Sequence, residues 1–366
     1  MRKGWEYKRW KEVLTIINGK NQSAVVDENG EYPIYGSGGI MGYANNWLCP
    51  ENCVIIGRKG NINKPIFVET KFWNVDTAFG LNANKEYLLP KFLYYFCLDY
   101  NFERHNKAVT IPSLTKADLL KIDIPLPPLS TQLAIVSELD KINELIRLKK
   151  EQLKDFDNLA QSLFYEMFGD PVENEKGWEV KTFGEIGSVE RGAGISKKDF
   201  VKEGLPCIHY GQLHTILGPR TTKHFTSIPH NLLPKYKIAH TGDLVMAITS
   251  EDVEGSCKST VWLGDYDIIV GSDAAIFHHK QDGTFLSYYT MTKAFFNEKA
   301  KYAKGFKVTH ISAKEIEKIP VYLPPLSLQQ LFAQRIEQIE REKSEVQKSI
   351  QDLETLLASR MQYWFE

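Results

Sequence analysis

Two long stretches of the chain place apolar residues at alternating steps of four and three positions, one between residues 135 and 167 and the other between 332 and 364. Such a spacing of 3.5, held for more than four heptads, is typical of a coiled-coil helix, because a slightly under-wound helix keeps that seam on one side. Each seam position has its counterpart 197 residues away. The seams comprise Ile135, Leu139, Ile142, Ile146, Leu153, Phe156 and Leu163 in the first stretch and Phe332, Ile336, Ile339, Val346, Ile350, Leu353 and Leu357 in the second.

Three basic residues interrupt these seams: Lys149 in the first stretch, and Lys343 and Arg360 in the second. Long basic side chains can bend out to solvent along their apolar stems. Alternatively, they fix the register of the helix pair and disfavour other pairings. The sequence leaves both interpretations open.

The sequence Leu-Pro-Pro-Leu-Ser opens each stretch, at 126–130 and again at 323–327. A proline pair does not lie inside a helix, so we expect an extended lead-in there, with Ser130 and Ser327 as the N-caps. The first helix is expected to end at Gly169-Asp170-Pro171, since a glycine followed shortly by a proline is a common stop signal.

A second repeated motif marks the start of each unit, because Gly4-Trp5-Glu6-Tyr7-Lys8 returns as Gly177-Trp178-Glu179-Val180-Lys181. Repetition at nearly 200 residues indicates a duplicated domain rather than a solenoid. The two helices are then expected to pair within one chain as an antiparallel coiled coil, with one globular domain at each end and a pseudo-two-fold axis. The predicted segments are 1–125 for the first globular domain, 126–169 for the central helix, 170–322 for the second globular domain and 323–366 for the distal helix.

The globular segments show mixed α and β character, so the predicted fold class is α+β. Strand-like runs cover Asn52–Gly57, Pro65–Val68 and Leu244–Ile248, and helices are expected over Pro90–Tyr100 and Phe285–Asn297. Between the Gly-Trp-Glu motif and the proline pair, the second unit holds 24 more residues than the first, with most of the excess after Gly211. Similar flanks with divergent interiors are expected when a common framework presents two different recognition surfaces.

Composition and charge add few restrictions. At 366 residues with 43% hydrophobic and 25% charged content, the chain has room for two or three ordinary globular domains. No apolar run approaches the roughly 18–20 residues of a membrane span, and the N-terminus lacks the apolar core of a signal peptide, so we expect a cytoplasmic location. The net charge of −1 alone disfavours nucleic-acid binding, but the acidic surplus lies in the helical segments and the globular segments are neutral to basic.

Metal and catalytic motifs do not stand out. Cys49 and Cys53 are the close pair among five scattered cysteines, and buried reduced thiols are favoured over a zinc site, which would need two more ligands. Gly19-Lys20 lacks the other residues of a phosphate-binding loop, and both proline pairs sit between leucines rather than in a methyltransferase motif. Eight of the nine histidines lie in the second half without a metal-ligand spacing. We therefore expect no catalytic residues and no metal in this chain.

The ordered set of motifs resembles the specificity subunit of type I restriction-modification systems. In that family a proline pair, often preceded by Ile-Pro as in Ile122 to Leu126, introduces each helix, and a glutamine follows as at Gln132 and Gln329. The Gly-Trp-Glu opening of each globular segment is also similar, and the resemblance covers essentially the full chain.

The resemblance implies a non-catalytic subunit in which each of two target-recognition domains reads one half of a bipartite, non-palindromic site on double-stranded DNA. It implies that the helices set the spacing and dock two modification subunits, which methylate adenine N6. Two restriction subunits can join them in phage defence. S-adenosylmethionine, ATP and Mg are then expected in the partner subunits, with no cofactor in this chain.

Candidate DNA-binding residues are polar and basic side chains in predicted loops, because such groups read base edges and phosphates. For any one of them, an ordinary solvated loop residue is an equally good interpretation. By contrast, Trp5 and Trp178 are expected to be core anchors rather than base-stacking groups. The candidates are Ser37, Asn45, Asn46, Arg58, Lys59, Asn61, Asn63, Lys64, Lys107 and Thr110 in the first domain, and Tyr210, Gln212, His214, Arg220, Thr221, Thr222, Lys223, Ser250, Lys258, Lys304, Lys307 and Thr309 in the second.

Two other functions remain open on the sequence. A coiled-coil scaffold that holds two protein partners without DNA contact would fit the near-neutral charge and predicts no salt-sensitive DNA affinity. A nuclease that uses Glu69 and Lys71 would cleave DNA with a metal and lose that activity on Glu69→Ala.

Overall fold

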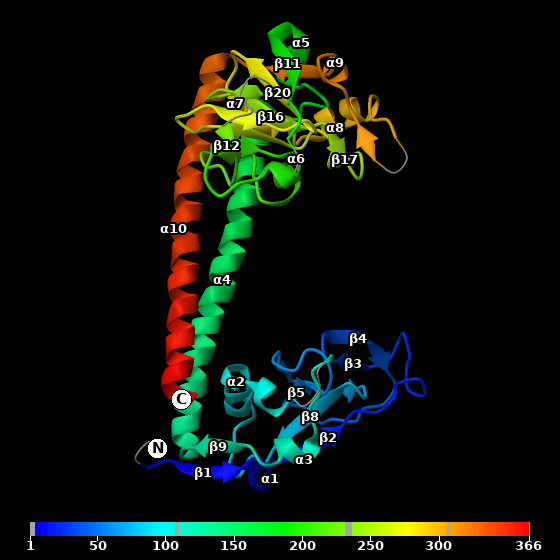
Figure 1. Ribbon diagram of the computed structural model, residues 1–366, viewed down its shortest axis with the longest axis vertical. Coiled ribbons are helices and arrows are strands. Elements are labelled where there is room, and N and C mark those ends of the chain that lie inside the picture. Colours follow the sequence, from blue (N-terminus) through cyan, green and yellow to red (C-terminus); the bar gives the residue numbers. More distant parts are fainter. Residues whose placement is uncertain (1–3, 107–109, 196, 231–235, 306–307, 366) are drawn as a thin grey trace. The chain divides into compact units, whose positions relative to one another are not determined.

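The computed structural model describes residues 4–106, 110–195, 197–230, 236–305 and 308–365 (Figure 1). Its contacts divide the chain into two compact units, one of residues 1–151 with 347–366 and the other of residues 152–346. Two 40-residue helices, α4 (Leu129–Phe168) and α10 (Leu326–Phe365), contribute to both units. Each half of each helix belongs to the unit whose globular core it packs against. The predicted segments 126–169 and 323–366 instead treat each helix as a separate segment. Among the described helices, none combines the length and apolar character needed to cross a membrane.

Within each unit the two helices run antiparallel. In the first unit Lys150 Nζ pairs with Glu354 Oε1 at 2.7 Å, and Arg360 Nη2 donates to Glu138 Oε2 at 3.1 Å. In the second unit Lys343 Nζ pairs with Asp157 Oδ1 at 2.7 Å. As the residue number rises along α4, the number of the partner residue on α10 falls. Together with the mixed globular parts, this pairing confirms the predicted α+β fold class with an antiparallel coiled coil.

The predicted seam positions are all buried or half-buried. Leu153, Phe156, Leu353 and Leu357 are half-buried, and the other ten are less exposed. Of the three interrupting cations, Lys343 and Arg360 make ion pairs across the helix pair. Such cross-helix pairs favour the interpretation in which the cations fix the register.

The first unit carries three sheets around one main core. A four-stranded sheet has the order β2-β8-β5-β6, a three-stranded sheet the order β4-β3-β7, and β1 pairs with β9. The core under the four-stranded sheet buries Trp10, Phe92 and Phe96, and Trp364 and Phe365 from α10 pack against it. The strands are β1 (Glu6–Arg9), β2 (Leu14–Asn18), β3 (Tyr32–Gly36), β4 (Gly39–Ala44), β5 (Cys53–Gly57), β6 (Ile66–Val68), β7 (Trp73–Asn74), β8 (Ala78–Ala83) and β9 (Asp123–Leu126), and the helices are α1 (Trp10–Val13), α2 (Pro90–Asp99), η1 (Phe102–His105) and α3 (Lys116–Leu119).

The second unit repeats this plan with additions. Its sheet β11-β20-β16-β18-β13 contains the counterparts of β2-β8-β5-β6, and β10 pairs with β22 as β1 does with β9. A four-stranded sheet β14-β12-β19-β15 and a short pair β17-β21 complete it. The strands are β10 (Glu179–Thr182), β11 (Gly187–Arg191), β12 (Leu205–Ile208), β13 (Arg220–Thr221), β14 (Thr226–Ile228), β15 (Lys237–Ala239), β16 (Leu244–Ala247), β17 (Thr249–Ser250), β18 (Ser259–Trp262), β19 (Ile268–Val270), β20 (Ala274–His279), β21 (Thr309–His310) and β22 (Pro320–Leu323). The helices are α5 (Phe183–Ile186), η2 (Lys197–Asp199), α6 (Tyr210–Thr215), α7 (Gly283–Tyr289), α8 (Lys293–Ala300) and α9 (Ala313–Ile316).

The predicted helix over Phe285–Asn297 is wrong as a single element, because α7 ends at Tyr289 and α8 starts at Lys293. Thr292 caps the second helix, since its Oγ1 accepts a hydrogen bond from Phe295 N at 3.3 Å. Threonine competes for backbone hydrogen bonds and favours such caps over helix interiors. The resulting turn at 290–292 lines the site described below.

The helix N-caps also differ from the prediction. Both long helices begin one residue before the expected serine, at Leu129 and Leu326, so Ser130 lies inside the first turn. The Pro128 carbonyl accepts the hydrogen bond from Gln132 N at 3.0 Å. The proline therefore occupies the cap position, and the serine hydroxyl is not needed there. At the other end, Gly169 follows Phe168 with φ +75°, as the predicted stop signal requires.

Candidate nucleic-acid interface

One backbone arrangement occurs in both units beside the central strand of the main sheet. In the first unit the connection after β5 pairs with the segment before α3, through a bridge between Lys59 and Ser113. Leu114 N also donates to Arg58 O at 2.9 Å. The second unit has the same arrangement in β17 and β21, where Ser250 faces Thr309. A common frame thus presents unlike side chains in the two units.

In the first unit this frame gathers several of the predicted DNA-binding residues. Gly60 has φ +81° and lies close to the β3–β4 turn, since a Cβ built on it would sit 3.9 Å from Ser37 Oγ. A Cβ on Gly38 would likewise sit 3.6 Å from Asn61 Nδ2. Ser37, Arg58, Lys59 and Asn61 therefore share one surface. Thr110 is exposed and lies three residues before Ser113, which pairs with Lys59. Lys64 is exposed, and Lys107 lies outside the described residues.

Other predicted residues of the first unit lie apart or are engaged internally. Asn45 and Asn46 follow the end of β4 that is opposite the Ser37 turn, because Gly36 pairs with Gly39 and Tyr32 with Ala44. Asn63 Oδ1 accepts from Phe102 N at 2.8 Å, which ties that side chain to η1.

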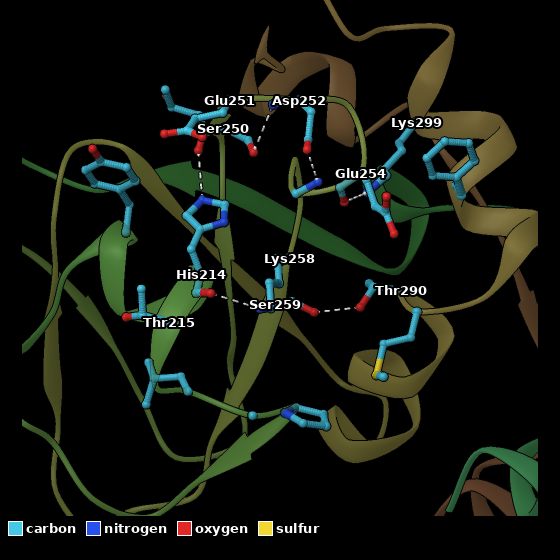
Figure 2. A pocket seen from close by; sticks show the side chains of 18 of the residues that line it. His214, Thr215, Ser250, Glu251, Asp252, Glu254, Lys258, Ser259, Thr290 and Lys299 are labelled. Atoms are coloured by element: carbon cyan, nitrogen blue, oxygen red, sulfur yellow. Dashed lines mark hydrogen bonds between the residues drawn. The ribbon is translucent and has the colours of Figure 1, made fainter. Parts of the chain in front are cut away.

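In the second unit the same frame forms one wall of a cleft of about 1100 Å³ (Figure 2). The cleft is lined by α6, by the 249–259 segment and by the α7–α8 connection, with Tyr165 of α4 at its edge. Four predicted residues line it, namely Tyr210, His214, Ser250 and Lys258. Acidic residues of the 249–259 segment, among them Glu251, line it as well.

Polar contacts within the chain hold the walls of this cleft in place. His214 Nε2 is hydrogen-bonded to Thr249 O at 3.1 Å, and Lys258 Nζ donates to His214 O at 3.2 Å. Lys299 is 4% exposed, and its ammonium donates to Glu254 O at 2.8 Å (Figure 2). It also donates to Ser256 O. Burial lowers the pKa of this ammonium. The buried ammonium of Lys299 therefore fixes the backbone of residues 249–258 from the protein interior.

Several predicted residues of the second unit serve the fold instead. Gln212 is 8% exposed, and its Oε1 accepts from His209 N at 2.9 Å. Thr309 is buried in β21, and Thr221 Oγ1 donates to Lys223 O at 2.9 Å. Lys304 pairs with Glu315. Arg220 lies half-buried in β13, Thr222 and Lys223 are exposed beyond it, and Lys307 lies outside the described residues.

Sequence reasoning missed the contribution of the α7–α8 connection and of Lys299. Thr290, Thr292 and Lys293 line the cleft because the predicted helix is broken there. Two threonines near the break were the available signal, since threonine favours caps over helix interiors. Nothing in the sequence distinguishes buried Lys299 from its exposed neighbour Lys301.

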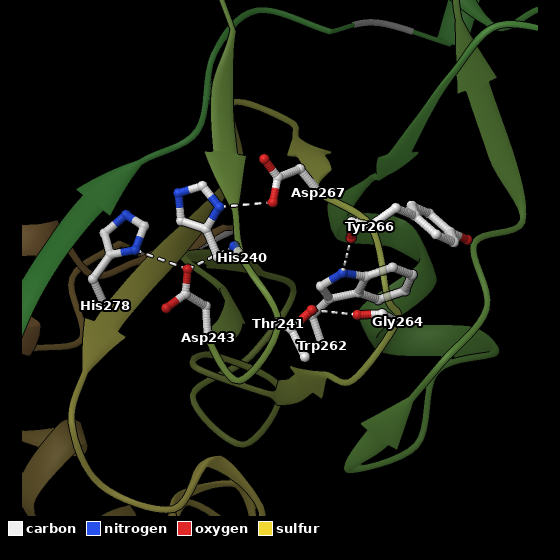
Figure 3. A network of polar contacts seen from close by, with 8 residues as sticks. All are labelled: His240, Thr241, Asp243, Trp262, Gly264, Tyr266, Asp267 and His278. Atoms are coloured by element: carbon white, nitrogen blue, oxygen red, sulfur yellow. Dashed lines mark hydrogen bonds and ion pairs between the residues drawn. The ribbon is translucent and has the colours of Figure 1, made fainter.

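Two histidines of the second unit, His240 and His278, belong to a polar network on the β15–β16 turn (Figure 3). His240 Nδ1 lies 2.7 Å from Asp267 Oδ1, and His278 Nδ1 lies 2.8 Å from Asp243 Oδ2. The hydrogen bond with Asp267 raises the pKa of His240. Asp243 Oδ2 also accepts from His240 N at 2.7 Å, which closes the turn. In the described ranges no group of three or more His, Cys, Asp or Glu residues could hold a metal ion.

Cys49 and Cys53 are free and buried. Cys49 Sγ donates to Asn74 Oδ1 at 3.1 Å, and burial raises the pKa of Cys53 to about 12. Both cysteines are therefore buried free thiols, the alternative that the sequence favours.

Comparisons with known proteins agree on one family. The model of the type I restriction modification DNA specificity domain matches residues 2–155 and 175–355. The MjaVIII specificity subunit of Methanocaldococcus jannaschii is 24% identical over 96% of this chain and 92% of its own length. The EcoDI specificity subunit of Escherichia coli is 21% identical over 94% of this chain and 83% of its own.

Two solved structures share the fold. The S subunit from M. genitalium superposes with a TM-score of 0.58 at 14% identity, covering 99% of this chain and 96% of that one. A chain from a study of complex assembly and conformational transition in the type I R-M system gives a TM-score of 0.62 at 18% identity, covering 99% and 97%.

Proposed function

Because this chain belongs to the type I restriction-modification DNA specificity family, and is therefore a non-catalytic subunit that recognises DNA sequence, we propose that each globular domain reads one half of a bipartite, non-palindromic site. The observation that carries this proposal is the common frame with unlike side chains. Exposed Lys59 faces Ser113 in one unit, whereas in the other the equivalent residues Ser250 and Thr309 are buried and the surface is formed by the cleft beside them. Unlike surfaces on one frame read unlike half-sites.

In the first domain, the proposed reading surface combines Ser37, Arg58, Lys59, Asn61 and Thr110. Guanidinium and amide groups make bidentate contacts to guanine and adenine in the major groove, and ammonium groups bind phosphates. In the second domain, the proposed surface is the cleft with Tyr210, His214 and Lys258. Gln212 and Thr309 support it from within the fold.

We further propose that the paired helices set the spacing between half-sites and dock two modification subunits. Each unit exposes two leucines that are equivalent in the repeat: Leu129 and Leu356 in the first, Leu326 and Leu159 in the second, all between 39% and 50% exposed. Apolar residues exposed twice at equivalent positions fit a partner that binds once per unit. Two restriction subunits can complete the complex.

The chemistry then belongs to the partners, which act in the cytoplasm. Modification subunits bring S-adenosylmethionine for methylation of adenine N6, and restriction subunits bring ATP and Mg for phage defence. This division of roles leaves recognition to the present chain.

The test is co-expression with the modification subunit encoded beside it in a methylation-free bacterial host, followed by modified-base sequencing. We expect N6-methyladenine at a single split motif, absent without this chain. No methylation from a folded modification subunit that binds S-adenosylmethionine would favour the scaffold alternative, which also predicts DNA affinity that does not fall steeply with salt.

A further inference from the structure

The exposed face of α4 in the first unit is apolar over about four turns. Leu133, Val136 and Leu145 line a groove of about 650 Å³, with polar neighbours at its rim. Leu133 is 61% exposed, Leu145 47% and Leu148, one turn further on, 46%. Leu148 lies just beyond the groove, and leucines exposed to this degree along one helix segment indicate a surface that a partner covers.

The repeat provides an internal comparison, because every residue of the groove, and Leu148 beyond it, has a counterpart 197 positions later in the second unit. Leu133 corresponds to Gln330, Leu145 to Glu342 and Leu148 to Glu345, and all three counterparts are exposed. The equivalent face of the second unit is therefore polar and acidic. The first unit therefore exposes leucines at three positions where the second unit is polar, whereas the second unit exposes Leu331 at the position of Ala134.

The charges around the groove fit a protein rather than DNA. Asp140 Oδ2 pairs with Lys91 Nζ at 3.0 Å, and Glu144 Oε1 pairs with Arg147 Nη2 at 2.6 Å. The rim is thus close to neutral, whereas phosphate binding needs a surplus of basic groups. An apolar centre with a polar rim is the usual composition of a protein interface.

The groove also continues the leucines that both units share. Leu129 lies one turn before Leu133 on the same helix, so a partner that binds at Leu129 in the first unit also reaches the groove. A self-association of two chains through the groove would leave the shared leucines of the second unit without a role. The continuity therefore favours the same partner at both units, with additional contacts at the first.

Building on the docking of two modification subunits proposed above, we propose that this groove binds an amphipathic helix of one modification subunit and makes the two docking sites unequal. Residues 133–148 span about 22 Å of helix, enough for partner anchors at positions i, i+4 and i+7. At the second unit the same partner helix meets Gln330, Glu342 and Glu345 and binds more weakly. The complex therefore assembles in two steps, the first at the first unit.

The experiment titrates the full chain with the purified modification subunit and follows stoichiometry by native mass spectrometry. For the unchanged chain we expect a 1:1 complex before a 2:1 complex, with dissociation constants that differ by at least about tenfold, as loss of buried apolar anchors usually produces. The double variant Leu145→Glu with Leu148→Glu copies the second unit's residues and should weaken the tight step by at least about tenfold. The reciprocal variant Glu342→Leu with Glu345→Leu should tighten the weak step.

Leu98→Glu is the matched control, because Leu98 is 40% exposed on α2 and does not line the groove. Stepwise dissociation constants that differ by no more than about fourfold, the statistical factor for two equal sites, or no change in either helix variant, would overturn the inference and leave the docking proposal intact. A dimer of the chain alone that becomes monomeric with Leu145→Glu and Leu148→Glu would assign the groove to a second copy and also overturn it. Failure of a modification subunit that binds S-adenosylmethionine to bind at all would overturn the docking proposal itself.

Discussion

Gln132 and Gln329 are fully buried at equivalent positions of the two long helices. Gln132 Oε1 accepts from Leu89 N at 2.9 Å, and its Nε2 donates to Tyr87 O and Pro127 O. Gln329 makes the equivalent bonds to Asp282 N and Pro324 O. Each glutamine thus fastens the start of a helix to the loop before α2 or α7. This clamp gives a structural reason for the glutamine that follows each proline pair.

We predict that Gln132→Ala lowers the free energy of unfolding by about 1–3 kcal/mol, because the buried Pro127 carbonyl and the partly buried Leu89 N–H and Tyr87 carbonyl each lose this hydrogen bond. Urea denaturation followed by circular dichroism measures this. Gln330→Ala is the control, since that side chain is exposed one residue after the second clamp. Equal losses in the two variants would contradict the clamp.

Lys299 holds the cleft wall of the second unit through its hydrogen bonds to Glu254 O and Ser256 O, so it should affect DNA recognition. Removing its ammonium in Lys299→Met leaves the carbonyls of Glu254 and Ser256 unpaired in the cleft wall, so the 249–258 segment should loosen. Modified-base sequencing after co-expression should then show a relaxed second half of the split motif with the first half unchanged. Lys301→Met, at an exposed lysine paired with Glu298, should leave both halves as they are. An unaltered motif in Lys299→Met would exclude a role of this segment in reading DNA.

At the scale of elements, the long helices could be predicted because their pattern is periodic and local, and the three strand-like runs are confirmed as β5, β6 and β16, whereas most other strands carry no such signal. The stop at Gly169 could also be predicted because its signal is local. The break between α7 and α8 could not be placed, since capping by Thr292 competes closely with helix continuation. The internal roles of Gln212 and Lys299 depend on contacts with residues distant in the sequence, and periodicity carries no information about those.

The helix pair of the first unit should respond to acid. The hydrogen bond from Arg360 lowers the pKa of Glu138 below its usual value of 4.5. A carboxyl whose pKa is lowered in the folded state contributes stability above its unfolded pKa and loses it as the pH falls through the folded value. Thermal unfolding between pH 6 and 3 should therefore show a loss below about pH 4.5 that is smaller in Glu138→Gln. A control, Glu345→Gln, changes an exposed carboxyl of α10 that makes no ion pair with any residue in the described ranges. An identical profile for both variants would contradict the role of Glu138.

At the scale of the whole molecule, the proposed function assigns spacing to the paired helices. One added heptad in each helix, between Glu151 and Gln152 and between Val346 and Gln347, keeps both seams in register because the repeat is seven residues. It lengthens each helix by roughly 10 Å, which corresponds to about three base pairs at 3.4 Å per step. Modified-base sequencing should then show the same two half-sites with a gap about three base pairs longer. An unchanged gap would mean that the helices do not set the spacing, whereas altered half-sites would mean that the insertion disturbs the domains that read them.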